Sequence, residues 1–270
     1  MIYAFTYVIA NLLVDLHPAD IADLLENLDE EERNYIFDLL DAKLASNVLP
    51  EVVDSVRERI LGELDEQRLC RIVDQMKTDD ATDIVAELPA QVAERVLEGI
   101  DRGESREVQE LLGYDEESAG GVMATEFVAV HQDRTVQEAI EEIRQAAERV
   151  GEIYNVYVVD DEGVLVGVLP LRKLILSEPD TPVSEIMDRD VISVQTDTDQ
   201  EEVANLVRKY DLVAIPVVDE RGRLVGRITI DDIVDIIDEE ASEDISKKAG
   251  TRDEEIAEES VIREAGIRFT

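Results

Sequence analysis

The chain has 270 residues, and its 26 Lys and Arg stand against 66 Asp and Glu, which gives a formal net charge of −40. Because contacts to nucleic-acid phosphates need a cationic surface, this balance argues against nucleic acid as a partner. One cysteine, Cys70, excludes an internal disulfide framework, and with only two histidines a zinc site is not expected. An apolar content of 44% is enough for folded cores, and the length suggests about two domains.

The excess of carboxylates allows two interpretations. Such a charge opposes a compact state unless cations are abundant, as they are around the solvated acidic surface of a halophilic protein. Alternatively, some of the carboxylates form cation sites. The two interpretations are compatible, and only the positions of the carboxylates separate them.

Residues 1–14 carry no charge. The run is shorter than the ~18 residues that indicate a membrane-spanning helix. It also lacks the basic start and the cleavage site of a secretory signal. A buried first helix is the favoured interpretation, and a segment that touches a membrane is the alternative. No other stretch is apolar enough to span a bilayer, so the sequence predicts a soluble chain in a reducing cell interior.

Apolar residues recur every twelve positions from Leu16 to Ile100, and two more apolar columns follow eight and nine positions later in each of the first seven units. Asp, Thr or Pro often follows the first column, and these residues cap or begin helices. Each unit therefore predicts a short helix and a turn. Stacked units would bury the apolar columns and form a helical superhelix.

One unit contains an unusual acidic helix start, with Asp79, Asp80 and Asp83 close together. Asp79 and Asp83 are four apart and share a helix face. Carboxylates at this end of a helix are stabilised by the helix dipole. The alternative is half of a site for a hard divalent cation.

After residue 120 the pattern changes to two similar units of about 60 residues, each predicted as β-α-β-β-α. Val158 to Gly163 reads VVDDEG, and Val217 to Gly222 reads VVDERG, with a matching LVG after each. The expected strands are 123–130, 154–159, 164–169, 191–194, 215–218 and 224–230. The expected helices between them are 135–150 and 199–209.

These repeats resemble a tandem CBS module, and the segment from Glu117 to Met123 (ESAGGVM) is similar to the junction motif of MgtE-type magnesium transporters. So are Thr196 to Val203 and the acidic run that begins at Asp231. The predicted fold class is thus α plus α/β. It has a helical superhelical N domain at 1–118, CBS 1 at 119–180 and CBS 2 at 181–238. An acidic connecting, plug-like helix and tail follow at 239–270.

The resemblance implies a Mg²⁺-sensing region that closes on Mg²⁺ and gates a transmembrane pore through the connecting helix. It also implies a homodimer formed through the CBS pair, at the cytoplasmic face of the membrane. The pore itself lies outside the sequence, which leaves two alternatives: a truncated chain, or a protein that acts without its own pore. No nucleophile–base pair or phosphate-binding loop is present, so an enzyme is not expected.

Eight of the fourteen residues from 231 to 244 are carboxylates, and several of these lie four apart on the predicted helix. Like charges at this spacing destabilise a helix unless a cation binds them, and Mg²⁺ needs only one or two carboxylates beside its waters. A halophilic solvated helix is the alternative. By motif position the resemblance implies these metal ligands: Asp79, Asp83, Asp199, Glu201, Asp211, Asp232, Asp235, Glu240, Glu243 and Asp244. Asn47 stands where the family has another carboxylate, so that site should be weaker.

CBS pairs often bind adenosine compounds such as ATP or AMP, through a Thr or Ser and an Asp that hold the ribose. The second unit keeps Thr229 and Asp232 in this frame, whereas the first unit has Pro170 and Lys173. Asp232 is therefore claimed by both the nucleotide and the metal interpretation. The alternative function is a stand-alone CBS regulator that binds an adenine nucleotide and controls another protein.

Overall fold

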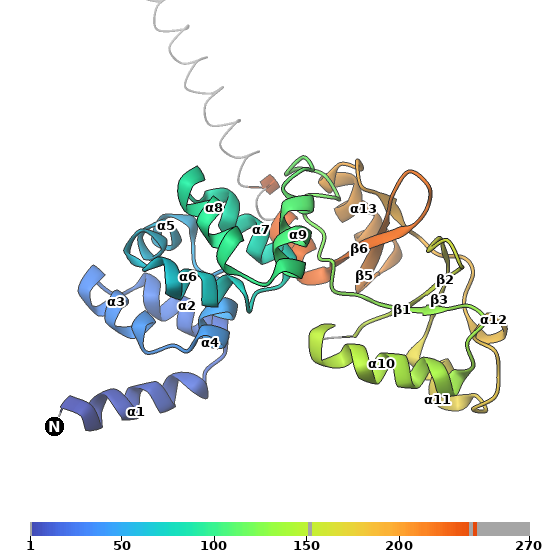
Figure 1. The fold of residues 1–270 in the computed structure, drawn as a ribbon, viewed down its shortest axis with the longest axis horizontal. Helices are drawn as coiled ribbons and strands as arrows, with labels where there is room; N and C mark the ends of the chain where they lie inside the picture. The colour runs from blue at the N-terminus through green and yellow to red at the C-terminus, as the bar shows by residue number, and fades with distance from the viewer. Residues whose placement is uncertain (1, 151–152, 238–239, 242–270) are drawn as a thin grey trace, which may run out of the picture.

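The computed structural model describes residues 2–150, 153–237 and 240–241. A group of short helices forms the N-terminal part, and two three-stranded sheets with their helices form the rest (Figure 1). The predicted α plus α/β fold class is confirmed.

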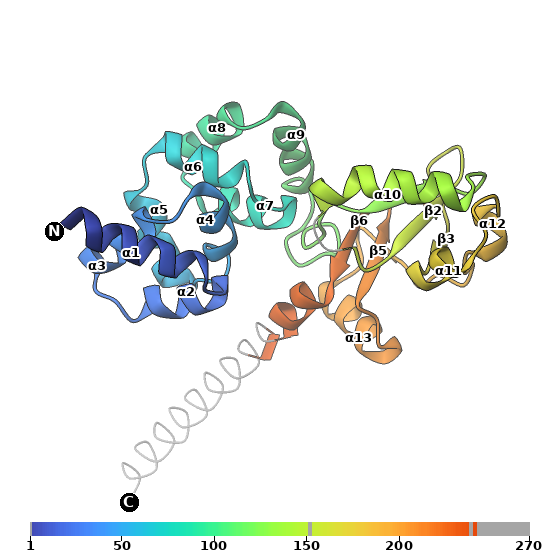
Figure 2. The ribbon, with the colours of Figure 1, turned by 90° about the horizontal axis from the view of Figure 1, so that it is seen from below.

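The N-terminal helices follow the twelve-residue repeat closely. From α2 to α9 they begin at residues 18, 30, 42, 54, 66, 78, 90 and 102, so each starts twelve residues after the one before it. They stack one upon another, as Figure 2 shows. The helices are α2 (Pro18–Glu26), α3 (Glu30–Asp38), α4 (Ala42–Val48), α5 (Asp54–Glu63), α6 (Glu66–Val73), α7 (Thr78–Glu87), α8 (Ala90–Gly99) and α9 (Arg102–Leu111).

The repeat sets these starts because the same position often carries a capping side chain. Asp29, Asp41 and Asp65 each accept a hydrogen bond from the backbone N–H three residues further on, at 2.8–3.0 Å. Asp101 does the same for Gly103 at 2.7 Å. Each cap satisfies a backbone donor that the helix leaves free.

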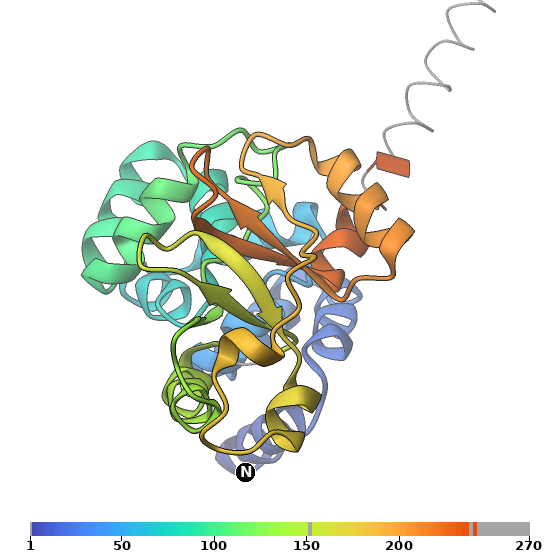
Figure 3. The same ribbon diagram turned by 90° about the vertical axis from the view of Figure 1, so that its right-hand side faces the viewer.

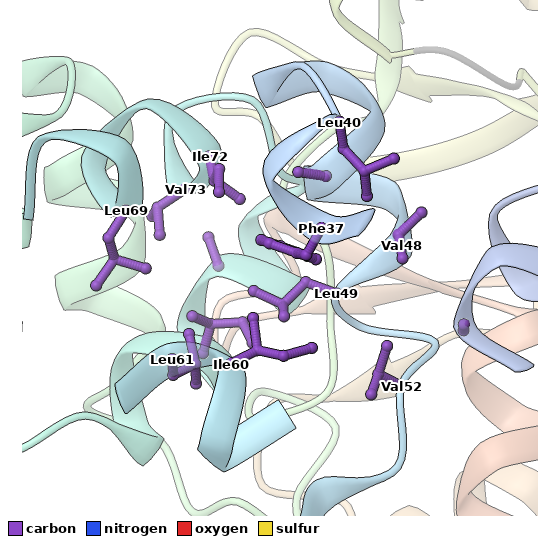
Figure 4. Packing of buried hydrophobic residues seen from close by; sticks show 14 of the residues in the cluster. Phe37, Leu40, Val48, Leu49, Val52, Ile60, Leu61, Leu69, Ile72 and Val73 are labelled. Atoms are coloured by element: carbon purple, nitrogen blue, oxygen red, sulfur yellow. The ribbon is translucent and has the colours of Figure 1, made fainter. Parts of the chain in front are cut away.

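The apolar columns meet in one core between the stacked helices (Figure 4). Phe37, Leu49 and Ile72 come from three different units and are at most 2% exposed. Arg68 is also inserted here, since it donates to the carbonyl oxygen of Phe37 at 2.7 Å and lies 5.5 Å from the centre of its ring. A residue of one unit thus satisfies the carbonyl at the end of a helix in another.

The uncharged first helix, α1 (Ile2–Val14), lies at the outer end of the stack. Leu13 is buried in the core, whereas Val8, Leu12 and Val14 are 53%, 61% and 67% exposed. The helix is therefore buried only along one side. No helix in the described part of the chain has the length and apolar character to cross a membrane.

The two α/β units have the same order of elements. The first has β1 (Val128–His131), α10 (Val136–Val150), β2 (Val156–Val159), β3 (Leu165–Leu169) and α11 (Leu171–Leu176). The second has β4 (Val194–Gln195), α13 (Gln200–Tyr210), β5 (Ala214–Val218) and β6 (Leu224–Thr229), and residues 230–237 are helical. A short helix, α12 (Val183–Ile186), joins the units. In each sheet the first two strands are parallel and the last two antiparallel (Figure 3).

Two strands are shorter than predicted because the first residues of each unit pair with a strand of the other unit. Ala124 pairs with Arg227 of β6, so residues 123–127 are not the start of β1. Met123 packs against Gly226, where a Cβ would come within 2.5 Å of its sulfur, and Met187 packs in the same way against Gly167. The predicted strand at 191–194 likewise keeps only its end in β4. This exchange ties the two units into one module.

Candidate cation-binding site between the helical repeats and the second CBS unit

The start of α7 meets the second α/β unit and the segment that links the two domains. The Thr78 N–H and hydroxyl donate to the Glu126 carboxylate at 3.1 and 3.0 Å, and the Thr125 N–H donates to the Thr78 hydroxyl at 2.8 Å. The Thr125 hydroxyl donates to Glu107 of α9 at 2.7 Å. These hydrogen bonds fix the acidic first turn of α7 against residues far along the chain.

On the other side of the contact, the end of β6 turns into the helix at 230–237. The Thr229 N–H and hydroxyl donate to the Asp232 carboxylate at 2.8 and 2.7 Å, and the hydroxyl also contacts Asp231. Thr229 is 4% exposed. Asp232 is the third residue of the helix at 230–237, and it reaches back to the N–H of Thr229 before the helix, as in a capping box, which holds its carboxylate at the domain contact.

Asp79, Asp80 and Asp232 affect one another's ionisation across this contact. Burial raises the pKa of Asp79, and burial together with the Asp79 charge raises the pKa of Asp80 well above its ordinary value. Burial, followed by the Asp79 charge, raises the pKa of Asp232 to about 6. The ionised forms are destabilised by burial and mutual repulsion, and a bound cation relieves both.

The donor chemistry at this contact fits Mg²⁺, which prefers hard carboxylate oxygens and keeps several waters. Among residues 2–150, 153–237 and 240–241, however, no three His, Cys, Asp or Glu side chains are gathered closely enough to hold an ion by themselves. An ion here would be held by one or two of these carboxylates and by water.

A second group of predicted ligands lies around the start of α13. Asp199 caps this helix by accepting from the Glu201 N–H at 2.9 Å, and it pairs with Ser118 in the junction motif. Glu240 accepts a hydrogen bond from the Gln200 side chain at 3.3 Å. The structure thus brings Asp199, Glu201 and Glu240 to the same end of α13.

The remaining predicted ligands are more scattered. Asp83 lies one turn after Asp79 but is exposed, and Asp235 is exposed on the helix at 230–237. Asp211 lies at the opposite end of α13 from Asp199, where it ends the helix in the left-handed conformation with φ of 52°. Glu243 and Asp244 lie outside the described residues.

The predicted set of site residues did not include Lys77, Glu126 or Asp231, which all lie at this contact. Lys77 lies 3.4 Å from Asp231 (Nζ to Oδ2), although the two residues are 154 positions apart. A single lysine does not form a recognisable motif in the sequence. The hydrogen bonds between Thr78 and Glu126 depend on how the domains contact each other. The acidic motif at Asp231 was the available signal for its side of the contact.

The residues at the nucleotide-motif positions have different contacts in the two units. In the first unit Pro170 is the N-cap residue before α11, and Lys173 forms an ion pair with Asp188. In the second unit the Thr229 hydroxyl donates a hydrogen bond to the Asp232 carboxylate. Between the two sheets, buried Tyr157 of β2 faces Arg227 of β6, and the Arg227 charge partly offsets the burial that raises the Tyr157 pKa to about 12. Neither Tyr157 nor Arg227 was expected from the motif.

A neighbouring acidic pair on the N domain gives a pH-dependent prediction. Burial and the charge of Asp74 raise the pKa of Glu104 to about 7, from an ordinary 4.5. The folded state therefore binds the proton of the Glu104 carboxyl more tightly than the unfolded state does. The resulting contribution to the stability of the fold is complete below pH 4.5 and is lost as the pH rises to about 7. Glu104→Gln should remove this pH-dependent loss of stability. The loss is no more than about 1 kcal/mol, because the side chain is partly solvated. Urea unfolding of both proteins across this range tests it, and parallel curves would contradict it.

The fold joins a stack of helical repeats to a pair of CBS-type α/β units. Residues 16–117 match the MgtE intracellular N domain, and residues 119–178 and 183–239 match the CBS domain. The crystal structure of the soluble part of a magnesium transporter superimposes with a TM-score of 0.81 at 34% identity, over 88% of this chain and 94% of that one. The cytosolic domain of the Mg²⁺ channel MgtE in complex with ATP gives 0.80 at 40% identity, over 84% and 93%.

A curated relative is the magnesium transporter MgtE of Thermus thermophilus, which is 52% identical over 141 residues, or 52% of this chain and 31% of that protein. The chain belongs to the MgtE family, and it corresponds to the intracellular N domain and the CBS pair of its members. It spans about a third of the length of the curated magnesium transporters that it matches.

Proposed function

We propose that this chain is the Mg²⁺-sensing region of a magnesium transporter, and that Mg²⁺ closes the N domain onto the CBS pair to shut the pore. The observation that carries the proposal is the facing of Asp79 and Asp80 with Asp232 across the domain contact, where each carboxylate disfavours the ionisation of the next. Without a divalent cation these charges push the domains apart. With Mg²⁺ bound, the same charges hold them together.

The proposed ligands are the carboxylates at two places: Asp79 and Asp232 at the α7 contact, with Asp83 and Asp235 exposed one turn further along the same helices, and Asp199, Glu201 and Glu240 at the start of α13. Glu243 and Asp244 are proposed as ligands from the motif alone, because they lie outside the described residues. Asp211 is the weakest member of the set, because its place at the far end of α13 is explained by ending that helix.

The test is the radius of gyration, measured by small-angle X-ray scattering while MgCl₂ is titrated into a fixed, high KCl background. Constant KCl keeps general screening unchanged. Compaction that saturates at low-millimolar Mg²⁺ would support discrete sites. The same compaction produced by extra KCl alone would instead identify the carboxylates as a halophilic surface.

Regulation by an adenine nucleotide is a second candidate, favoured by the buried Thr229–Asp232 pair and by the relative whose structure contains ATP. A ribose bound there would take over the hydrogen bonds that now join Thr229 to Asp232. Calorimetric titration with AMP avoids chelation of Mg²⁺ by a triphosphate. Binding that Thr229→Val abolishes supports this site, and binding that survives the substitution excludes it.

We also propose that the chain forms a homodimer through its first CBS unit and acts beside a transmembrane pore domain at the inner face of the membrane. Ile175 and Leu176 of α11 are 79% and 73% exposed, and Ile175 lines an open hollow of about 740 Å³ between α10 and α11. Such a surface suits a second copy. Ile175→Glu should yield monomers by light scattering, whereas Val53→Glu, at an exposed site on the N domain, should not. A dimeric Ile175→Glu variant would contradict this interface.

A further inference from the structure

Lys77 is a cation placed where the proposed function expects a metal ion. It is the residue before α7, and its ammonium reaches across the domain contact to Asp231 at 3.4 Å. Neither the ligand set nor the nucleotide motif includes it.

Four carboxylates act on this one ammonium group. Burial alone would lower the pKa of Lys77, but the charges of Asp79 and Asp80 on its own helix and of Asp231 and Asp232 across the contact raise it above its ordinary value. The same ammonium helps lower the pKa of Asp231, against the effect of burial. The backbone of Lys77 thus belongs to the helical N domain, whereas its side chain contacts the second CBS unit.

A tethered ammonium differs from a dissolved ion in one respect that matters here. It is already held by the chain at the contact, so closing the contact does not require the capture of a free ion from solution. The lysine neutralises part of the repulsion between α7 and the helix at 230–237 at any Mg²⁺ concentration. Its single charge leaves most of the carboxylate charge for a divalent ion.

We propose that Lys77 is a built-in counter-cation that holds α7 against the second CBS unit when Mg²⁺ is absent, and so limits how far Mg²⁺ alone controls closure. Its effect on the Mg²⁺ response rests on the proposed function, whereas its effect on the Mg²⁺-free state does not. Lys77 is a positioning residue, because it acts on the arrangement of the ligands.

The experiment compares Lys77→Gln with the wild-type chain by small-angle scattering at fixed KCl, first with a chelator and then with MgCl₂. In the chelator the ratio of closed to open molecules should fall about fivefold, which is the loss of an ion pair of ~1 kcal/mol, and the radius of gyration should rise. Added Mg²⁺ should then produce a larger compaction than in the wild type. Lys77→Arg, which keeps the charge, should behave as the wild type.

Lys173→Gln is the matched control, because it removes the same charge from an ion pair inside the CBS pair, between Lys173 of the first unit and Asp188 at the start of the second. It should leave both states unchanged. Exchanging the pair, as Lys77→Asp with Asp231→Lys, should restore the compactness that Lys77→Asp alone loses. An exchanged pair that stays as expanded as Lys77→Asp would overturn the proposal.

The two proposals fail in different ways. A Lys77→Gln variant as compact as the wild type in chelator overturns the role of Lys77, whatever Mg²⁺ does. A wild-type chain that ignores Mg²⁺, while Lys77→Gln still expands in chelator, removes the sensing function and leaves the role of Lys77 supported.

Discussion

Phe37→Ala is expected to lower the free energy of unfolding by about 3–5 kcal/mol, the cost of removing a large aromatic side chain from a packed core. Phe37 is 2% exposed and lies among Leu40, Val48 and Leu49 in the core of the repeats (Figure 4). The substitution leaves a cavity and also removes the ring beneath the Arg68 guanidinium. Because each repeat is stabilised mainly by its neighbours, the damage should spread along the stack. Urea unfolding followed by circular dichroism, at constant high KCl, measures it.

Tyr35→Ala is the matched control, since it removes an aromatic side chain from the same helix. Tyr35 is 42% exposed, and its hydroxyl is hydrogen-bonded to Thr6 of α1 at 2.8 Å. Its loss should cost about 1 kcal/mol or less. Equal losses for the two variants would mean that the repeat core does not carry the stability of this domain.

The helical half of the fold was predictable as one short helix and turn per unit, because its information is local. The apolar columns and the capping aspartates such as Asp29 and Asp65 lie within one twelve-residue unit, so the pattern fixes where each helix begins. The expected β-α-β-β-α order of both later units is likewise present. Errors occurred where the partner is remote: Ala124 was expected to lie in the first strand of its own unit and instead pairs with Arg227 of the other.

The candidate site was less predictable, for the same reason. The sequence pointed to Asp79 and Asp232 separately, but no local pattern indicates that α7 docks on the end of β6. The position of Asp83 on the same helix face as Asp79 did not predict that Asp79 is buried whereas Asp83 is exposed. Lys77 and Glu126 likewise gain their partners only when the domains meet.

The double substitution Asp232→Asn and Asp235→Asn is expected to raise the Mg²⁺ concentration needed for half-maximal compaction by about tenfold or more. Substitutions of residues that only support the metal ligands already weaken metal binding by this factor. The fold should not suffer. An asparagine oxygen can still accept the hydrogen bonds from Thr229, and the loss of a charge beside Asp79 removes repulsion from the contact. The midpoint of thermal unfolding without Mg²⁺ should therefore be unchanged or higher.

A control with the same change of charge separates site binding from screening. Asp133 and Asp161 have side chains 78% and 94% exposed, and both lie near His131 in the first CBS unit, away from α7. Asp133→Asn with Asp161→Asn should leave the Mg²⁺ midpoint unchanged, because a diffuse ion atmosphere responds to net charge whereas a site responds to position. If both pairs shift the midpoint equally, Mg²⁺ acts on this chain as a general counter-ion. If only the first pair does, the end of β6 is where the domains sense it.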